Sequence, residues 1–276
     1  MRSLLARTYA LRLRASLLRC HKNKPTVIHS RINGHALLVL ANEDVGRAIH
    51  FGGSYETNET EYLRKMIRSD AVCVDVGANV GYYTMLMAQT ASGGSVHAFE
   101  PIALNAALLR ATIELNGMSN VRINQCALGN SIGVVSFSQS SDSAYSSIHD
   151  TQRKPLERTL TVPVTTLDSY LEREGVKRVD ILKADVEGAE GLVVAGASRL
   201  LSDETRRPHI VLLELFDQNL QAFGSSVKTV IEDMQRFAYR PFVITDKARL
   251  VQYSDESKAH YYNVLFLPTT MKTLTN

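Results

Sequence analysis

A glycine-rich turn between a buried strand and a helix is the sequence feature that most constrains this fold. It lies at residues 74–84, which read ValAspValGlyAlaAsnValGlyTyrTyrThr. Gly77 and Gly81 allow the backbone to approach a ligand closely, and Asn79 tolerates a left-handed backbone conformation. The helix that begins near Val80 adds free N–H groups at its first turn. This order of elements predicts a nucleoside-binding crevice at the carboxyl end of a parallel sheet.

Strand and helix patterns alternate along the rest of the chain. Helical spacing or capping marks residues 59–67, 80–91, 102–115 and 226–237. Seven apolar runs typical of strands lie around these helices, at residues 71–76, 95–99, 121–126, 179–183, 210–215, 239–244 and 262–267. Strands separated by helices form a parallel sheet that is covered on both faces. We therefore predict an α/β fold with a mostly parallel, seven-stranded sheet.

Residues 1–50 differ in character from the rest of the chain. The first 42 residues carry eight Lys or Arg and no acid, whereas the remaining 23 bases face 28 acids and leave a net charge of about −5. Strand-like runs at residues 26–29 and 36–40 flank Asn33-Gly34, which suits a tight hairpin. We predict a basic helix and a β-hairpin as an appendage, followed by the main domain at residues 51–276. The basic leader is also compatible with weak membrane-surface contact or a targeting role.

Composition excludes several classes of protein. The chain is 45% hydrophobic and 21% charged, which is typical of a globular protein and not of a disordered one. Cys20, Cys73 and Cys126 form no C-x-x-C pair, so the sequence indicates neither a thiolate metal site nor a disulfide framework, and we expect a cytoplasmic location. The main domain has no excess of basic residues, which counts against a nucleic-acid substrate.

A polar stretch at residues 136–150 separates the third and fourth strand patterns. It reads SerPheSerGlnSerSerAspSerAlaTyrSerSerIleHisAsp, and its Ser content predicts a surface loop. Two interpretations stay open. The loop is either a solvated connection or a lid that faces the substrate over the carboxyl ends of the strands, with His149 inside it.

Two acids follow the first two strands of the alternating region. Asp75 lies immediately before the glycine-rich turn, and Glu100 ends the second strand pattern in HisAlaPheGluPro. A carboxylate at the tip of the second strand is placed to accept hydrogen bonds from ribose hydroxyls. A helix cap at Asp75 and a surface position for Glu100 are the structural alternatives. The two placements together favour cofactor binding.

Seven segments in order resemble one known family. They are TyrGluThrAsnGluThrGlu (55–61), AspValGlyAlaAsnValGlyTyrTyrThr (75–84), AlaPheGluPro (98–101), AlaLeuGly (127–129), LeuLysAlaAspValGluGlyAlaGlu (182–190), LeuLeuGluLeu (212–215) and AsnValLeuPheLeuPro (263–268). Through them the chain resembles the FkbM-type methyltransferases over residues 51–268. The resemblance implies the Rossmann-like class I methyltransferase fold and S-adenosylmethionine as the cofactor.

The resemblance also implies a reaction and a set of cofactor contacts. The methyl group is transferred to a hydroxyl of a sugar, a glycan or a natural-product small molecule. The residues expected to contact the cofactor are Asp75, Gly77, Ala78, Asn79, Gly81, Tyr82, Glu100, Pro101, Cys126, Ala127 and Asp185.

Four residues at or just beyond the carboxyl ends of the fourth and fifth strand patterns are the candidates for catalysis: Lys183, Asp185, Glu187 and Glu214. A carboxylate within hydrogen-bond reach of an alcohol removes its proton as the methyl group transfers, and Asp185 is our first choice for this base. Glu187 and Glu214 compete with it, and His149 or no base at all are the remaining alternatives. Their structural alternatives are a cap at the helix near residue 188 for Glu187 and an ion pair with Lys183 for Glu214. These acids also suit magnesium or calcium, but we predict no metal site.

Two other functions share parts of this pattern. An NAD-dependent dehydrogenase or epimerase has the same strand, glycine turn and second acid, but the sequence lacks its usual glycine spacing and a Tyr-x-x-x-Lys pair. A non-catalytic nucleoside-binding module is the third class. The sequence carries no signal for the oligomeric state.

Overall fold

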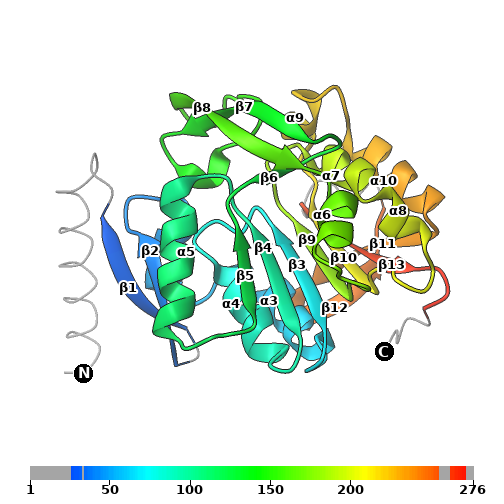
Figure 1. The fold of residues 1–276 in the computed structure, drawn as a ribbon, viewed down its shortest axis with the longest axis horizontal. Helices are drawn as coiled ribbons and strands as arrows, with labels where there is room; N and C mark the ends of the chain where they lie inside the picture. Colours follow the sequence, from blue (N-terminus) through cyan, green and yellow to red (C-terminus); the bar gives the residue numbers. More distant parts are fainter. Residues whose placement is uncertain (1–25, 33, 255–261, 272–276) are drawn as a thin grey trace.

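The computed structural model describes residues 26–32, 34–254 and 262–271 (Figure 1). The basic helix predicted within residues 1–25 lies outside these residues. No helix in the described part of the chain is long and apolar enough to span a bilayer.

An eight-stranded sheet forms the centre of the molecule, in the order β12-β11-β13-β10-β9-β3-β4-β5 (Figure 1). Its strands are β3 (Val72–Val76), β4 (Ser95–Phe99), β5 (Val121–Asn124), β9 (Ile181–Ala184), β10 (Ile210–Glu214), β11 (Tyr239–Thr245), β12 (Arg249–Gln252) and β13 (Asn263–Pro268). The five strands from β5 to β10 run parallel, and β13 is antiparallel to both of its neighbours. The Rossmann-like α/β prediction is therefore confirmed.

The predicted number of seven strands is one too low. All seven predicted strands are present, and β12 pairs antiparallel with β11 as an extra edge strand. Its four residues, ArgLeuValGln, are partly or fully exposed and form too short an alternation to be recognised from the sequence.

Helices cover both faces of the sheet, because neighbouring residues of each strand point to opposite sides. Ile210 and Leu212 join one core, whereas Val211 and Leu213 join the other. The first core packs against α3 (Thr57–Met66), α4 (Tyr82–Thr90) and the Leu108 side of α5 (Ala103–Leu115). The second packs against α6 (Leu167–Arg173), α7 (Glu190–Gly196), α8 (Ser198–Ser202), α9 (Asp217–Gln221) and α10 (Val227–Arg236).

The predicted N-terminal hairpin is present. Strands β1 (Val27–Ile32) and β2 (His35–Leu40) pair antiparallel with Ile32 opposite His35, and α2 (Asp44–Gly52) follows. The backbone N–H groups of Ala36 and Leu38 donate to side chains of α5 and its C-terminal cap, Asn116 and Thr112, at 2.9 and 3.1 Å. The proposed boundary between residues 50 and 51 falls inside α2, and the division into appendage and domain stays a prediction.

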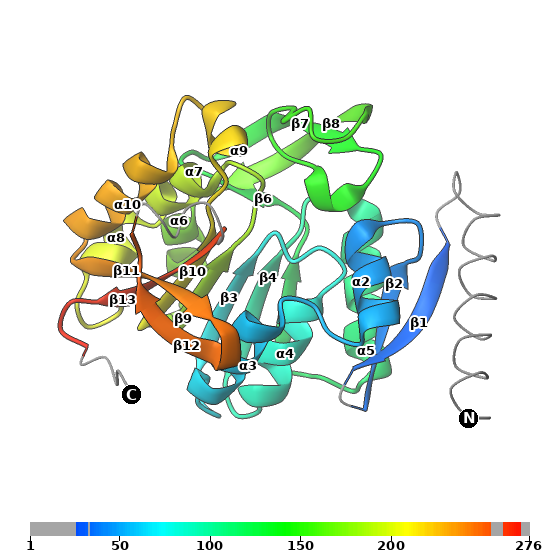
Figure 2. The same ribbon diagram turned by 180° about the vertical axis from the view of Figure 1, so that it is seen from behind.

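A three-stranded sheet lies beside the larger one, where Figures 1 and 2 show β7 and β8 above the central strands. It comprises β6 (Ala127–Leu128), β7 (Gly133–Ser140) and β8 (Leu156–Thr165). The prediction of a loop at residues 136–150 is therefore wrong for its first part. Pairing with β8 turns a Ser-rich sequence into a strand, because strand preference depends on the partner more than on the residue type. The remainder contains a short 3-10 helix, η1 (Ser143–Tyr145).

Candidate active site

A cavity of about 290 Å³ opens at the carboxyl ends of β3, β4, β9 and β10, with η1 on its far side. All the residues predicted for the site line it except Gly81. Those that do are Asp75, Gly77, Ala78, Asn79, Tyr82, Glu100, Pro101, Cys126, Ala127, Lys183, Asp185, Glu187 and Glu214. Its walls also include Ser143, Tyr145 and Ile148, so the stretch for which a lid was one of two open interpretations does face the cavity.

The two glycines of the turn have a packing role. Gly77 has a φ of +74°, and a Cβ atom there would lie 1.9 Å from the backbone oxygen of Asp185. Gly81 has a φ of +96°, and its Cβ would lie 2.3 Å from Leu109 Cδ1. The sequence predicted that these glycines leave room for a ligand. In the structure both leave room for other parts of the protein, and Gly77 also lines the cavity. Gly81 accordingly lies outside the cavity wall.

The acids at the ends of β3 and β4 are buried and held by fixed donors. Glu100 is 4% exposed, and its carboxylate accepts the backbone N–H groups of Asn79 and Ile102, each at 2.8 Å. Burial raises the pKa of Glu100 to about 7. Asp75 is fully buried and accepts the Thr84 hydroxyl at 2.6 Å. Glu100 is thus no surface acid, and Asp75 accepts from Thr84 in the first turn of α4, through the hydroxyl and the backbone N–H of that residue.

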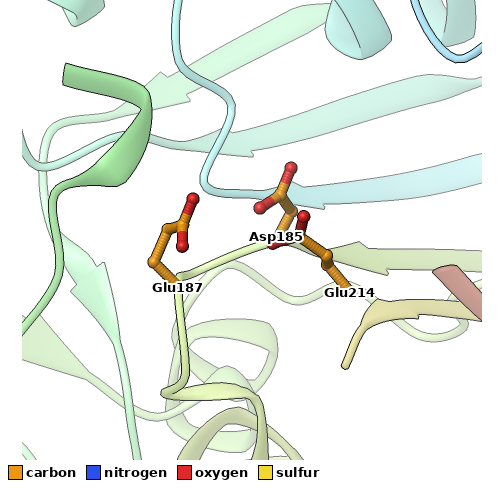
Figure 3. Close-up of side chains that lie close together, drawn as sticks. All are labelled: Asp185, Glu187 and Glu214. Atoms are coloured by element: carbon orange, nitrogen blue, oxygen red, sulfur yellow. The ribbon is translucent and has the colours of Figure 1, made fainter. Parts of the chain in front are cut away.

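Three carboxylates come together at the ends of β9 and β10 (Figure 3). One oxygen each of Asp185, Glu187 and Glu214 lies within 4.8 Å of the others. Asp185 follows β9 and Glu214 ends β10, and the parallel pairing of these strands places Leu213 opposite Ala184, so the next residues meet at the same edge. Glu187 stands in the turn after β9 with a left-handed backbone (φ 54°), which aims its side chain back at the cavity.

Two cations contact this acidic group, and neither contacts Glu214. Lys183 is 3% exposed, and its Nζ lies 3.3 Å from Asp185 Oδ2 and 4.0 Å from Asp75 Oδ1. Arg153 Nη1 lies 2.7 Å from Glu187 Oε2. The ion pair between Glu214 and Lys183 that the sequence suggested is therefore replaced by pairs with Asp185 and Asp75.

The turn after β9 is capped by Glu190 and not by Glu187. Glu190 Oε1 accepts the backbone N–H groups of Val186 and Gly188 at 3.0 and 3.2 Å. The Glu187 carboxylate instead accepts from the side chains of Arg153 and Asn219. Burial, followed by the charge of Asp185, raises the pKa of Glu187 to about 8. Burial and the neighbouring carboxylates raise the pKa of Glu214 well above its usual range.

Three polar residues near the site escaped the sequence prediction. Glu56, in the segment 55–61, has a left-handed backbone (φ 43°) and accepts from the Tyr83 hydroxyl at 2.6 Å. Glu56 could have been named from the sequence, because residues 55–61 are one of the segments that resemble the family. Arg153 and Asn219 come from stretches without a recognisable pattern. His149, by contrast, packs against Phe223 in a tilted arrangement with ring centroids 4.6 Å apart and is absent from the cavity wall.

A family model for the FkbM methyltransferase domain matches residues 75–241, which is more than half of the sequence. This chain belongs to the FkbM methyltransferase family. The family is one of methyltransferases, and the cofactor predicted from the resemblance, S-adenosylmethionine, is confirmed as the cofactor of this family.

Relatives of known name support the family assignment. Methyltransferase 1 of Beauveria bassiana is 30% identical over 46% of this chain and 58% of its own length. The 31-O-demethyl-FK506 methyltransferase FkbM of Streptomyces tacrolimicus is 30% identical over 49% of this chain and 63% of its own length. The 2-O-methyltransferase NoeI of Sinorhizobium fredii is 22% identical over 62% of this chain and 73% of its own. The chain thus spans about three fifths of the first two relatives.

Proposed function

We propose that this chain transfers the methyl group of S-adenosylmethionine to a hydroxyl oxygen of a sugar, a glycan or a natural-product small molecule. The observation that carries the proposal is the cavity at the carboxyl ends of four neighbouring strands, with acids from each strand in its wall. Two relatives whose names specify O-methylation support the choice of oxygen as the acceptor.

The β3–β4 half of the cavity fits the cofactor. S-adenosylmethionine carries a positive sulfonium and an ammonium group, and Asp75 Oδ1 is a buried oxygen without a hydrogen-bond partner in the described part of the chain. Glu100 uses one lone pair of each oxygen for a backbone N–H, which leaves further lone pairs for ribose hydroxyls. Tyr82, Pro101, Cys126 and Ala127 add mainly apolar wall.

The β9–β10 half supplies a base for the acceptor. The acceptor oxygen attacks the methyl carbon, the C–S bond breaks with its electron pair going to sulfur, and the hydroxyl proton passes to a carboxylate. Asp185 is our proposed base, because its side chain is 23% exposed at the cavity and Lys183 holds one of its oxygens. Much of the rate comes from holding the acceptor oxygen in line with the methyl group.

The predicted partners and location stay predictions. We propose a small-molecule or glycan acceptor, no nucleic acid, a cytoplasmic location, and weak membrane-surface contact through the basic N-terminus. The family assignment favours methyl transfer over the dehydrogenase or epimerase alternative.

Methyl transfer is tested by measuring the two reaction products. The full chain is incubated with S-adenosylmethionine and a panel of sugar and polyol acceptors, and S-adenosylhomocysteine and the methylated acceptor are quantified by mass spectrometry. We expect acceptor-dependent release that Asp185→Asn lowers strongly. Glu232→Gln, an exposed charge-matched control on α10, should release as much as the wild type. Cofactor binding without release on any acceptor would instead favour the non-catalytic module.

A further inference from the structure

We propose that Glu56 is a positioning residue for the base. Through Tyr83 it holds the ammonium group of Lys183 against Asp185, although Glu56 is not itself part of the cavity wall. Its effect on the rate rests on the proposed function, because that function makes Asp185 the base. The contacts among the four side chains do not depend on it.

Glu56 directly precedes α3, yet it does not cap that helix. Its side chain makes no capping hydrogen bond to the first turn, which is the usual task of a residue at this position. Its backbone is left-handed, with a φ of 43° and a ψ of 63°, a conformation that is unfavourable for a residue with a Cβ atom. Neither capping nor backbone preference therefore accounts for a glutamate here, so its carboxylate must be considered.

Both oxygens of the Glu56 carboxylate have a side-chain partner. Oε2 accepts the Tyr83 hydroxyl at 2.6 Å, and Oε1 accepts Asn263 Nδ2 at 2.9 Å. Tyr83 belongs to the first turn of α4, directly after the glycine-rich turn, and is 4% exposed. Burial, followed by the charge of Asp185, raises the pKa of Glu56, whereas the charge of Lys183 lowers it. The carboxylate thus holds the tyrosine hydroxyl in place and also interacts with the charges of the site.

The ring of Tyr83 in turn supports the ammonium group of Lys183. Lys183 Nζ lies 4.8 Å from the centroid of this ring, which is within the range of a cation–π contact. The same nitrogen lies 3.3 Å from Asp185 Oδ2 and 4.0 Å from Asp75 Oδ1. Burial would lower the pKa of Lys183, but three surrounding carboxylates, Glu56 among them, raise it above its usual value. A charged ammonium group therefore contacts the ring and the base at once.

These contacts fix the side chain that takes the proton. Lys183 holds Oδ2 of Asp185, which leaves Oδ1 to receive the proton of the acceptor hydroxyl. Without the bond between Glu56 and the Tyr83 hydroxyl, the ring is held less firmly, and the ammonium group can move away from Asp185. Since a small displacement of a reacting group lowers the rate strongly, loss of Glu56 should lower kcat and leave the affinity for S-adenosylmethionine nearly unchanged.

A cycle of substitutions in the full chain tests whether Glu56 acts through Lys183. Glu56→Met removes the acceptor of the Tyr83 hydroxyl, Glu56→Gln keeps an amide oxygen for it, and Lys183→Met removes the ammonium group. We expect Glu56→Met to lower kcat about tenfold in the wild type and less than about twofold in Lys183→Met, because the two residues act in one chain of contacts. Glu56→Gln should restore most of the rate.

The rates are measured with the acceptor that gives the most product in the panel above, and melting curves show that each variant is folded. S-adenosylmethionine affinity is measured by calorimetry on the same samples. Equal fold-losses of kcat in the two backgrounds, or a loss of cofactor affinity as large as the loss of kcat, would show that Glu56 has only a structural role and would overturn the proposal.

A spectroscopic measurement tests the contacts without any acceptor. In a chain labelled with ¹³C-lysine, the ε-CH₂ signal of Lys183 is the one that disappears in Lys183→Met, or in Lys183→Arg if the first variant does not fold. The Tyr83 ring shifts this signal because it lies next to the ammonium group. We expect Glu56→Met and Tyr83→Phe to move the signal in the same direction. Glu61→Gln, an exposed charge-matched control on α3, should leave it in place.

The two measurements together separate this proposal from the proposed function. An unchanged Lys183 signal in Glu56→Met, in a chain whose wild type transfers methyl groups, would overturn the positioning role and leave the proposed function intact. A Lys183 signal that moves in Glu56→Met, in a chain that methylates no acceptor, would support the contacts of Glu56 and contradict the proposed function.

Discussion

The two halves of the cavity hold acids in opposite ways. At the ends of β3 and β4, Glu100 meets two backbone N–H groups and Asp75 meets a hydroxyl. At the ends of β9 and β10, Asp185 and Glu187 meet long side-chain cations, and Glu214 has a buried oxygen that meets no donor in the described residues. The first half is fixed by the backbone, whereas the second is held by charges that can rearrange.

This difference shows how one fold serves two ligands. Backbone donors keep an acid in one position at no cost when the ligand arrives, which suits a cofactor that every turnover uses in the same pose. Crowded carboxylates repel one another, and a positively charged or proton-donating ligand relieves that repulsion. We therefore assign the first half to the cofactor and the second to the acceptor.

The largest effect should come from the base in the β9–β10 half. Asp185→Asn keeps the shape of the side chain and removes its ability to take a proton. We expect kcat to fall by about 10²–10⁴. The rate is measured from S-adenosylhomocysteine release at saturating substrates. A variant with wild-type kcat would show that Asp185 is not the base and would move the assignment to Glu187 or Glu214.

The corresponding acid-to-amide substitution in the β3–β4 half should weaken the binding of S-adenosylmethionine. Glu100→Gln replaces an acceptor of two backbone N–H groups with an amide that has one acceptor atom. We expect S-adenosylmethionine to bind about 10–100-fold more weakly, since bonds to charged groups contribute about 1.5–3 kcal/mol. Calorimetry measures this, with the exposed Glu114→Gln on α5 as control. Equal losses in both variants would show that the loss is not specific to the proposed ribose site.

Stability should fall as pH rises, because several buried acids bind their protons more tightly in the folded chain. The pKa values of Glu43, Glu100 and Glu190 are raised to about 7 and that of Glu187 to about 8, chiefly by burial. Between pH 4.5 and 8 the folded state holds more protons than the unfolded state, so the free energy of unfolding decreases across this window. Melting curves at a series of pH values should show the decrease.

A variant tests whether Glu187, in the β9–β10 half, contributes to this pH effect. Glu187→Gln should reduce the decrease of melting temperature mainly near pH 8, where that residue titrates in the folded state. A melting temperature that rises steadily from pH 5 to 8 in the wild type would contradict the burial of these acids.

The smallest effect concerns the glycine that lies outside the cavity. Gly81 and Gly117 both have a positive φ, but only at Gly81 would a Cβ atom meet another side chain, Leu109. Gly81→Ala should therefore destabilise the chain by about 1–3 kcal/mol more than Gly117→Ala. Chemical denaturation measures the difference. Equal losses would show that φ alone requires glycine at residue 81.

How far the sequence predicts this molecule also differs between the two halves. The β3–β4 half follows mostly from local order, since a strand, a turn and an acid lie within residues 72–100, and Glu100 accepts from the nearby Asn79 and Ile102. The β9–β10 half depends on contacts between distant residues. Arg153 reaches Glu187 across 34 positions and Asn219 reaches it across 32. No short pattern around Arg153 or Asn219 indicates these contacts.

The features that the sequence did not predict correctly also depend on contacts with other parts of the chain. β7 forms because β8 pairs with it, and β12 forms because β11 offers an edge, so neither strand is visible in its own residues. The structural alternatives for Glu187 and Glu214, a helix cap and an ion pair with Lys183, failed because a second acid takes each place, as Glu190 does for the turn after β9. Helices and strands with a strong local pattern were predicted correctly. Which of several neighbouring polar side chains bond to one another could be decided only from the structure.

Calorimetry with S-adenosylmethionine is the most direct test of the central claim, that the acids of β3 and β4 hold the cofactor. The full chain is titrated with S-adenosylmethionine, S-adenosylhomocysteine and NAD, and the titrations are repeated with Glu100→Gln. We predict one binding site for each of the first two ligands, no response to NAD, and weaker binding in the variant. Binding of NAD alone, or unchanged affinity for S-adenosylmethionine in Glu100→Gln, would contradict the account.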